Sequence, residues 1–66
     1  MKEADIWRMA NDMIRDYGAE AEACARFRSA KLREEGIFDD AEEWARVAEA
    51  IAELQRKTPG SDESVN

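Results

Sequence analysis

The sequence has no histidine, a single cysteine and a single proline. Without histidine, the chain lacks the commonest general base and the commonest metal ligand. One cysteine excludes an intrachain disulfide and a zinc site built from cysteines. Glycine-rich nucleotide-binding motifs and zinc-protease motifs are also missing. We therefore expect no enzymatic activity, no cofactor, no metal site and no small-molecule substrate.

Long apolar runs are absent as well, and none approaches the roughly 20 residues that a membrane-spanning helix needs. The first residues carry the charges of Lys2, Glu3 and Asp5 and contain no apolar signal core. These features predict a cytoplasmic protein that does not bind membranes.

Acidic residues outnumber basic ones by 16 to 10 in the 66-residue chain, giving a formal net charge of −6. A negative protein repels the polyanionic surfaces of nucleic acids, so we expect no nucleic-acid partner. The basic residues of one segment are scattered around its expected helix, which makes a DNA-binding module the least favoured alternative. These residues are Arg26, Arg28, Lys31 and Arg33.

Glycine and proline divide the chain into helical segments. Gly18 and Gly36 stand where helices would end, and Pro59-Gly60 follows the last periodic segment. The sequence predicts an all-α fold, a small antiparallel three-helix unit with helices at about 3–17, 19–35 and 40–57. We expect one helical domain over residues 1–58 and a flexible acidic tail over 59–66.

The first and last predicted helices each have one apolar face. Apolar residues of 3–17 fall within one arc of a helical wheel, and those of 40–57 follow 3-4-3 spacing. The latter are Trp44, Val47, Ile51 and Leu54. A dense acidic cluster precedes them, and its spacing is typical of a capped helix N-terminus rather than of a cation site. The cluster comprises Asp39, Asp40, Glu42 and Glu43.

The middle predicted helix has two apolar strips more than 100° apart, which indicates contact from two sides. One strip consists of Ala23, Cys24, Phe27 and Ala30, and the other of Ala21, Ala25 and Leu32. Cys24 has no histidine partner, so we expect it to act as a small buried apolar residue.

Trp7 and Trp44 are predicted core residues near the edge of the core, where an indole N–H can find a partner. Either tryptophan could instead anchor an intermolecular interface. Met9 and Met13 could be an adaptable binding stripe or fillers of the core. The candidate interface residues are Trp7, Met9, Met13, Ala21, Ala25 and Leu32.

Several strings resemble a family of small helical proteins of unknown function, found mainly in alphaproteobacteria. They are Asp5-Ile6-Trp7-Arg8-x-Ala10-Asn11, Gly18-Ala19, and Ala50-Ile51-x-Glu53-Leu54-Gln55-Arg56. The resemblance covers nearly the whole chain but departs at Gly36-Ile37-Phe38-Asp39, where the family often has Gly-Asp. It implies a short, freestanding bacterial protein and no site residue.

A chain this small buries a limited core, and self-association is a common remedy. The sequence therefore favours a noncatalytic protein–protein interaction module, including self-association into a homodimer. The alternative is a small acidic regulatory protein that binds a basic partner, because residues 37–58 carry six acids against three bases.

Overall fold

A computed structural model describes residues 2–56, and these residues form helices joined by short connections. The elements are α1 (Glu3–Tyr17), a short 3₁₀ helix η1 (Gly18–Glu20), α2 (Ala21–Glu34) and α3 (Phe38–Arg56). No strand occurs among the described residues, so the predicted all-α class is confirmed. The predicted tail at 59–66 and the predicted end of the last helix at 57 lie outside the described residues.

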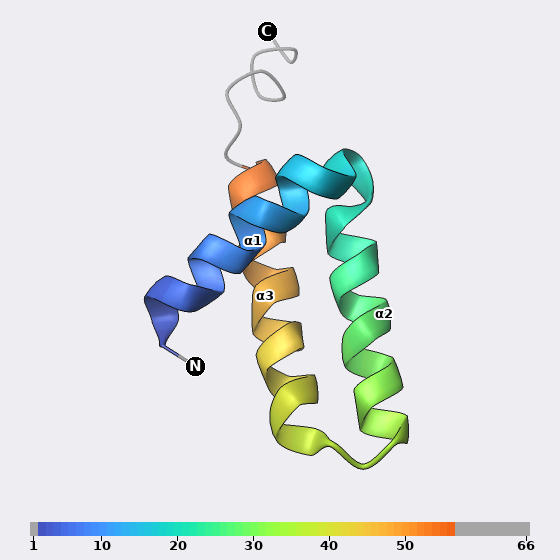
Figure 1. The fold of residues 1–66 in the computed structure, drawn as a ribbon. Helices are drawn as coiled ribbons and strands as arrows, with labels where there is room; N and C mark the ends of the chain where they lie inside the picture. Colours follow the sequence, from blue (N-terminus) through green and yellow to red (C-terminus); the bar gives the residue numbers. More distant parts are fainter. Residues whose placement is uncertain (1, 57–66) are drawn as a thin grey trace, which may run out of the picture.

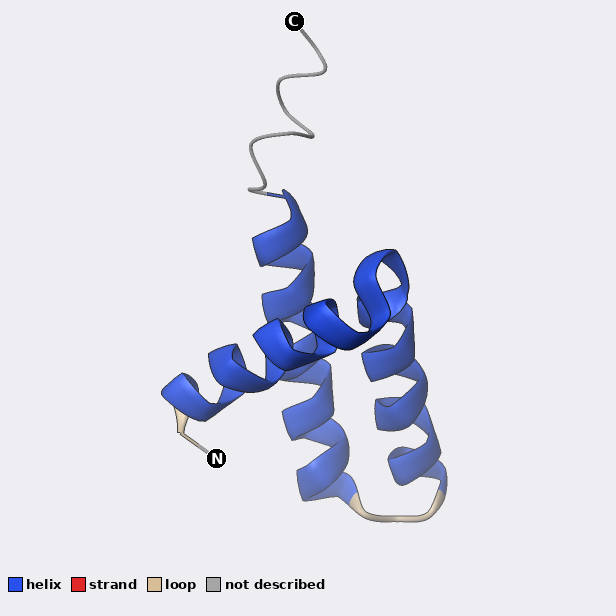
Figure 2. Cartoon of the chain, turned by 45° about the horizontal axis from the view of Figure 1, so that its top comes forward, coloured by secondary structure: helices blue, strands red, loops and turns tan. Residues whose placement is uncertain are grey.

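Only α2 and α3 form an antiparallel pair (Figure 1). Helix α1 begins on the side of α3 that faces away from α2, crosses α3 and ends beside the start of α2 (Figures 1 and 2). The predicted antiparallel arrangement of three helices is therefore wrong for α1. Small residues make this close crossing possible, since Ala10 on α1 and Ala48 and Ala50 on α3 are all buried.

The corner between α1 and α2 is fixed by Gly18, whose φ of 58° and ψ of −127° suit glycine alone. The Gly18 carbonyl oxygen also accepts a 2.9 Å hydrogen bond from Nε2 of Gln55, near the end of α3. Because η1 takes up residues 18–20, α2 begins at Ala21 rather than at the predicted residue 19. The bond to Gln55 holds the corner against α3.

The corner between α2 and α3 is a Schellman motif centred on Gly36, which has a φ of 81°. The Gly36 N–H donates to the Arg33 carbonyl oxygen at 3.1 Å, and the Ile37 N–H donates to that of Leu32 at 2.9 Å. Ala41 N–H then donates to the Ile37 carbonyl oxygen at 3.0 Å. Helix α3 consequently starts at Phe38, two residues before the predicted start.

The core lies where α1 crosses the α2–α3 pair, and alanine dominates it. Val47 and Ile51 are its largest fully buried side chains. Half-buried apolar residues from α1 and α3 pack around this centre: Trp7, Met9, Met13, Ile14, Trp44 and Leu54. A core built from alanines brings helices close together but leaves little room for aromatic rings. Two of the aromatic side chains, Tyr17 and Phe27, therefore remain largely exposed at 48 % and 68 %.

Candidate functional site: an apolar groove on α2

The exposed rings of Tyr17 and Phe27 belong to one groove between the end of α1 and the outer face of α2. We call this surface the apolar groove; it has a volume of about 520 Å³. Its lining residues are Met13, Tyr17, Glu20, Ala23, Cys24, Phe27, Arg28 and Lys31. Apolar side chains form the middle of the groove, while Glu20 on η1 and Lys31 on α2 mark its two ends.

The outer face of α2 is exposed because the opposite face carries the core contacts. Ala21, Ala25 and Ser29 are buried, and Leu32 is half-buried. Phe27 follows Ala25 by two residues, which places its side chain about 160° around the helix from the core. The direction of Phe27 is thus a direct consequence of alanine packing on the inner face.

This result corrects the predicted interface. Ala21 and Ala25 have no exposed surface, because α1 and α3 cover them within the same chain. They are therefore unavailable to a partner, and Leu32 is partly covered with them. The surface left open on α2 carries the other strip, whose residues Ala23, Cys24 and Phe27 line the apolar groove, while its fourth residue Ala30 lines a separate hollow.

The sulfur-containing residues split between core and groove. Met9 and Met13 are both half-buried and pack against the core, and Met13 also lines the apolar groove. Cys24 has a free thiol and is half-buried rather than buried, because the groove leaves one side of it open. Met9 therefore fills space beside the core, while Met13 and Cys24 contribute to the open surface.

Both tryptophans lie at the edge of the core, as the sequence predicts. Trp44 is half-buried on α3, and the Arg28 guanidinium lies 4.9 Å from the centre of its ring. A cation over an indole face is attracted by the ring quadrupole. This contact fixes Arg28 along one flank of α2, beside the apolar groove.

The remaining basic residues of α2 lie elsewhere. Arg26 forms a 2.8 Å ion pair with Glu22, and Arg26 and Arg33 line a separate hollow with Ser29, Ala30 and Ala45. The four basic residues of this segment are therefore divided between different faces, as their spacing predicts.

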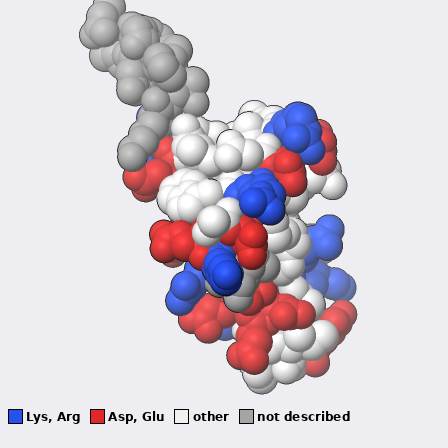
Figure 3. Space-filling model, turned by 60° about the vertical axis from the view of Figure 1, so that its left-hand side comes forward, with Lys and Arg blue, Asp and Glu red and all other residues white. Residues whose placement is uncertain are grey.

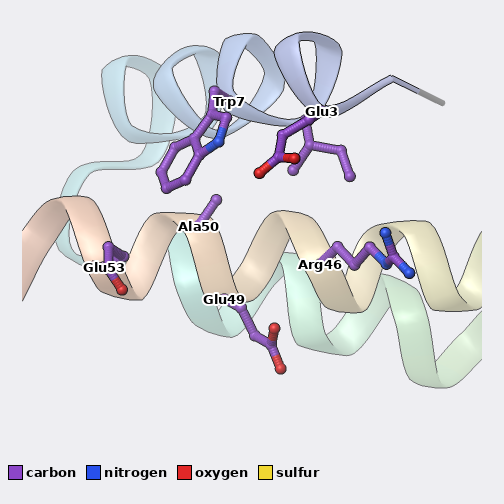
Figure 4. Close-up of a pocket in the computed structure, with 7 residues that line it drawn as sticks. Glu3, Trp7, Arg46, Glu49, Ala50 and Glu53 are labelled. Atoms are coloured by element: carbon purple, nitrogen blue, oxygen red, sulfur yellow. The ribbon is translucent and has the colours of Figure 1, made fainter.

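A second groove lies between the first half of α1 and α3, and we call it the acidic groove. Its lining residues are Glu3, Ile6, Trp7, Arg46, Glu49, Ala50 and Glu53. Trp7 points from α1 toward Ala50 on α3, and Glu3 points into the same gap (Figure 4). Figure 3 shows acidic side chains gathered on this side of the molecule, with basic ones interspersed.

The acidic cluster at the start of α3 adjoins this groove. Asp39 and Asp40 stand in the first turn of α3, where the helix dipole favours negative charge. Arg46 lies beside Asp39, Glu42 and Glu43 in an adjoining hollow. Within residues 2–56, no group of three potential ligands is close enough to hold a metal ion.

Sequence reasoning missed Phe27 and Tyr17 as site residues. The size of Phe27 could have indicated the exposed strip of α2, because no residue of the predicted interface strip is as large. That predicted strip consists of Ala21, Ala25 and Leu32. Alanine spacing alone did not indicate which strip faces the core.

Within the described residues, no helix has both the length and the apolar character needed to cross a bilayer. Comparison of the chain with protein-family models, with curated proteins and with solved structures found no match. The resemblance to small alphaproteobacterial proteins therefore stays a prediction. We infer the function from the surface of the structure instead.

Proposed function

We propose that this chain is a noncatalytic protein–protein interaction module and that the apolar groove is its contact surface. The observation that carries the proposal is the 68 % exposure of Phe27 within a groove that Met13, Tyr17 and Cys24 also line. Burying a phenylalanine side chain that would otherwise meet water contributes roughly 1.5 to 3 kcal/mol. Aromatic anchors with a charged rim are typical of binding surfaces.

The dimensions of the apolar groove favour a polypeptide partner. Glu20 at the end of η1 and Lys31 on α2 bound it, and the eleven residue steps between them span about 16 Å. A surface of this length accommodates three turns of a second helix, as in other helix-in-groove complexes. The rim offers one acid, Glu20, and one base, Lys31, for orienting that helix, while the Arg28 guanidinium lies over Trp44.

The chain provides a matched pair of variants for testing this function. Phe27 lies in the apolar groove and is 68 % exposed, while Phe38 lies at the start of α3 and is 62 % exposed. Phe27→Glu and Phe38→Glu therefore make the same chemical change at similar exposure. We expect the wild-type chain and Phe38→Glu to elute in a complex larger than the free chain in cell extracts. Phe27→Glu should elute as the free chain.

Equal elution of the two variants in a larger complex would contradict the proposal, and so would elution of the wild type as the free chain even at the highest concentration loaded. Circular dichroism of the purified variants controls for folding. Both should keep the wild-type helix content, because neither side chain belongs to the core.

The alternative function uses the acidic groove, where Glu3 and Glu49 lie near Glu53. Together with the net charge of −6, this surface favours a regulatory protein that binds a basic partner. Such binding would weaken strongly between 0.05 and about 1 M salt, where the screening length falls to about 3 Å. Binding through the apolar groove would persist at high salt, so salt dependence separates the two candidates.

A further inference from the structure

We infer that the occupant of the apolar groove is a second copy of this chain, whose α2 packs antiparallel against the first. The inference rests on the proposed function, since it names the partner of the same groove. Its basis is the order of residues along the exposed stripe of α2. That order is Glu20 at the end of η1, followed by Ala23, Cys24, Phe27, Arg28 and Lys31 on α2.

The stripe is complementary to itself when it is reversed. In a two-fold symmetric dimer, the same patch from both subunits forms the interface, and each contact occurs twice. A two-fold axis between positions 25 and 26 places Glu20 opposite the partner's Lys31. The same axis places Lys31 opposite the partner's Glu20, so both ends of the interface carry an opposite-charge pair.

Side-chain sizes match under the same axis. Phe27 comes to lie opposite the partner's Cys24, and Arg28 comes to lie opposite the partner's Ala23. A large exposed ring on each subunit thus meets the small residues of the other, which is how helices interlock at close distance. Met13 and Tyr17 border this contact from α1 and extend the apolar area.

Charge also selects the direction of the pairing. A parallel pair would place Glu20 against the partner's Glu20 and Lys31 against the partner's Lys31, and both contacts would be repulsive. Arg28 does not disturb the antiparallel pairing, because its guanidinium is held over Trp44 at the flank of α2. The antiparallel dimer is therefore the arrangement that the charges of the stripe favour.

The contact is small, since one helix and the end of another supply it. Interfaces at the low end of the size range form reversible complexes. We therefore expect a dimer that dissociates on dilution. Light scattering over a hundredfold concentration range should show the mass rise from the chain mass of 7.5 kDa toward twice that value.

Charge reversal tests the register. Glu20→Lys creates Lys–Lys contacts at both ends of the dimer, and Lys31→Glu creates Glu–Glu contacts. Each single variant should raise the dimerisation midpoint about tenfold, because two favourable pairs become two repulsive ones. The double variant Glu20→Lys/Lys31→Glu should restore the wild-type midpoint. An equimolar mixture of the two single variants should form a heterodimer, since both of its pairs are attractive.

Arg33→Glu is the matched control for Lys31→Glu, because Arg33 is exposed on α2 but lies outside the apolar groove. It should leave the midpoint unchanged. A mass of one chain at every concentration would overturn the inference, and so would failure of the double variant to restore dimerisation. A misfolded single variant cannot mimic the expected pattern, because heterodimer formation requires both chains to be folded.

Cys24 provides an independent readout, since its half-buried free thiol lies within one helical turn of the proposed axis. A short bis-maleimide should link two wild-type chains through Cys24 but should not link Phe27→Glu chains. If the chain is monomeric and remains unlinked while Phe27→Glu still abolishes a complex in extracts, the second-copy inference fails and the proposed function stands. If Phe27→Glu changes neither the cross-linking through Cys24 nor the elution of the complex from extracts, the proposed function fails as well.

Discussion

The Ser29 hydroxyl donates a 2.6 Å hydrogen bond to the carbonyl oxygen of Ala41. Both residues are buried, and the bond joins α2 to the first turns of α3. Among the buried side chains of residues 2–56, Ser29 is polar and the others are apolar. The bond therefore links α2 to α3 on the side of α2 opposite to Phe27.

Ser29→Ala should lower the free energy of unfolding by about 1 kcal/mol, the typical net contribution of one such hydrogen bond. Chemical denaturation monitored by circular dichroism measures this change. Ala30→Ser is a suitable control, because residue 30 is exposed and makes no core contact. An unchanged denaturation midpoint for Ser29→Ala would show that the bond does not stabilise the hairpin.

Gly36 should tolerate asparagine better than alanine. Its φ of 81° is a left-handed conformation, and the Cβ of a substituted residue would meet no atom within 4 Å. The cost of Gly36→Ala is therefore conformational rather than steric, and we expect about 1 kcal/mol of destabilisation. Gly36→Asn should cost less, since asparagine adopts this conformation more readily. Equal unfolding free energies for the two variants would contradict this account of the corner.

Arg28→Ala should expose one face of the Trp44 indole to water. The guanidinium lies 4.9 Å from the ring centre, and losing this contact should cost about 0.5 to 1 kcal/mol. In a Trp7→Phe background, fluorescence reports on Trp44 alone and should shift to longer wavelength. Arg33→Ala removes an arginine that lines a separate hollow and should leave the emission unchanged. An identical spectrum for both variants would refute the stacking.

Core and groove residues should differ sharply in their effects on stability. Ile51→Ala removes a fully buried side chain and should cost about 2 to 5 kcal/mol. Phe27→Ala removes a larger side chain from an exposed position and should change the unfolding free energy of the monomer by less than about 0.5 kcal/mol. Thermal unfolding at a concentration where the chain is monomeric compares them. A large loss for Phe27→Ala would place that ring in the core and remove the basis of the proposed function.

Much of the helical structure could be predicted from the spacing of apolar residues and from the positions of glycine and proline. The range of α1 matches its prediction because one amphipathic face extends from Ile6 to Tyr17. The other boundaries shifted by one or two residues for local reasons. Gly18 starts a 3₁₀ turn, and the Schellman motif at Gly36 lets α3 begin at once.

The crossing of α1 over α3 could not be predicted, because it depends on contacts between distant residues. Gln55 lies 37 positions from Gly18, and no local pattern indicates their hydrogen bond. The assignment of faces on α2 failed for a related reason. Ala21 and Ala23 have the same side chain, so only the position of α1 and α3 decides which one is buried.

The central claim is that another polypeptide covers the surface around Phe27 in the cell. Phe27→p-benzoylphenylalanine tests this most directly, because the photoreactive ring replaces a similar ring at the centre of the apolar groove. The same replacement at Phe38 is the control. We predict a discrete cross-linked adduct from position 27 and none from position 38. Absence of an adduct at position 27, or equal adducts at both positions, would contradict the account.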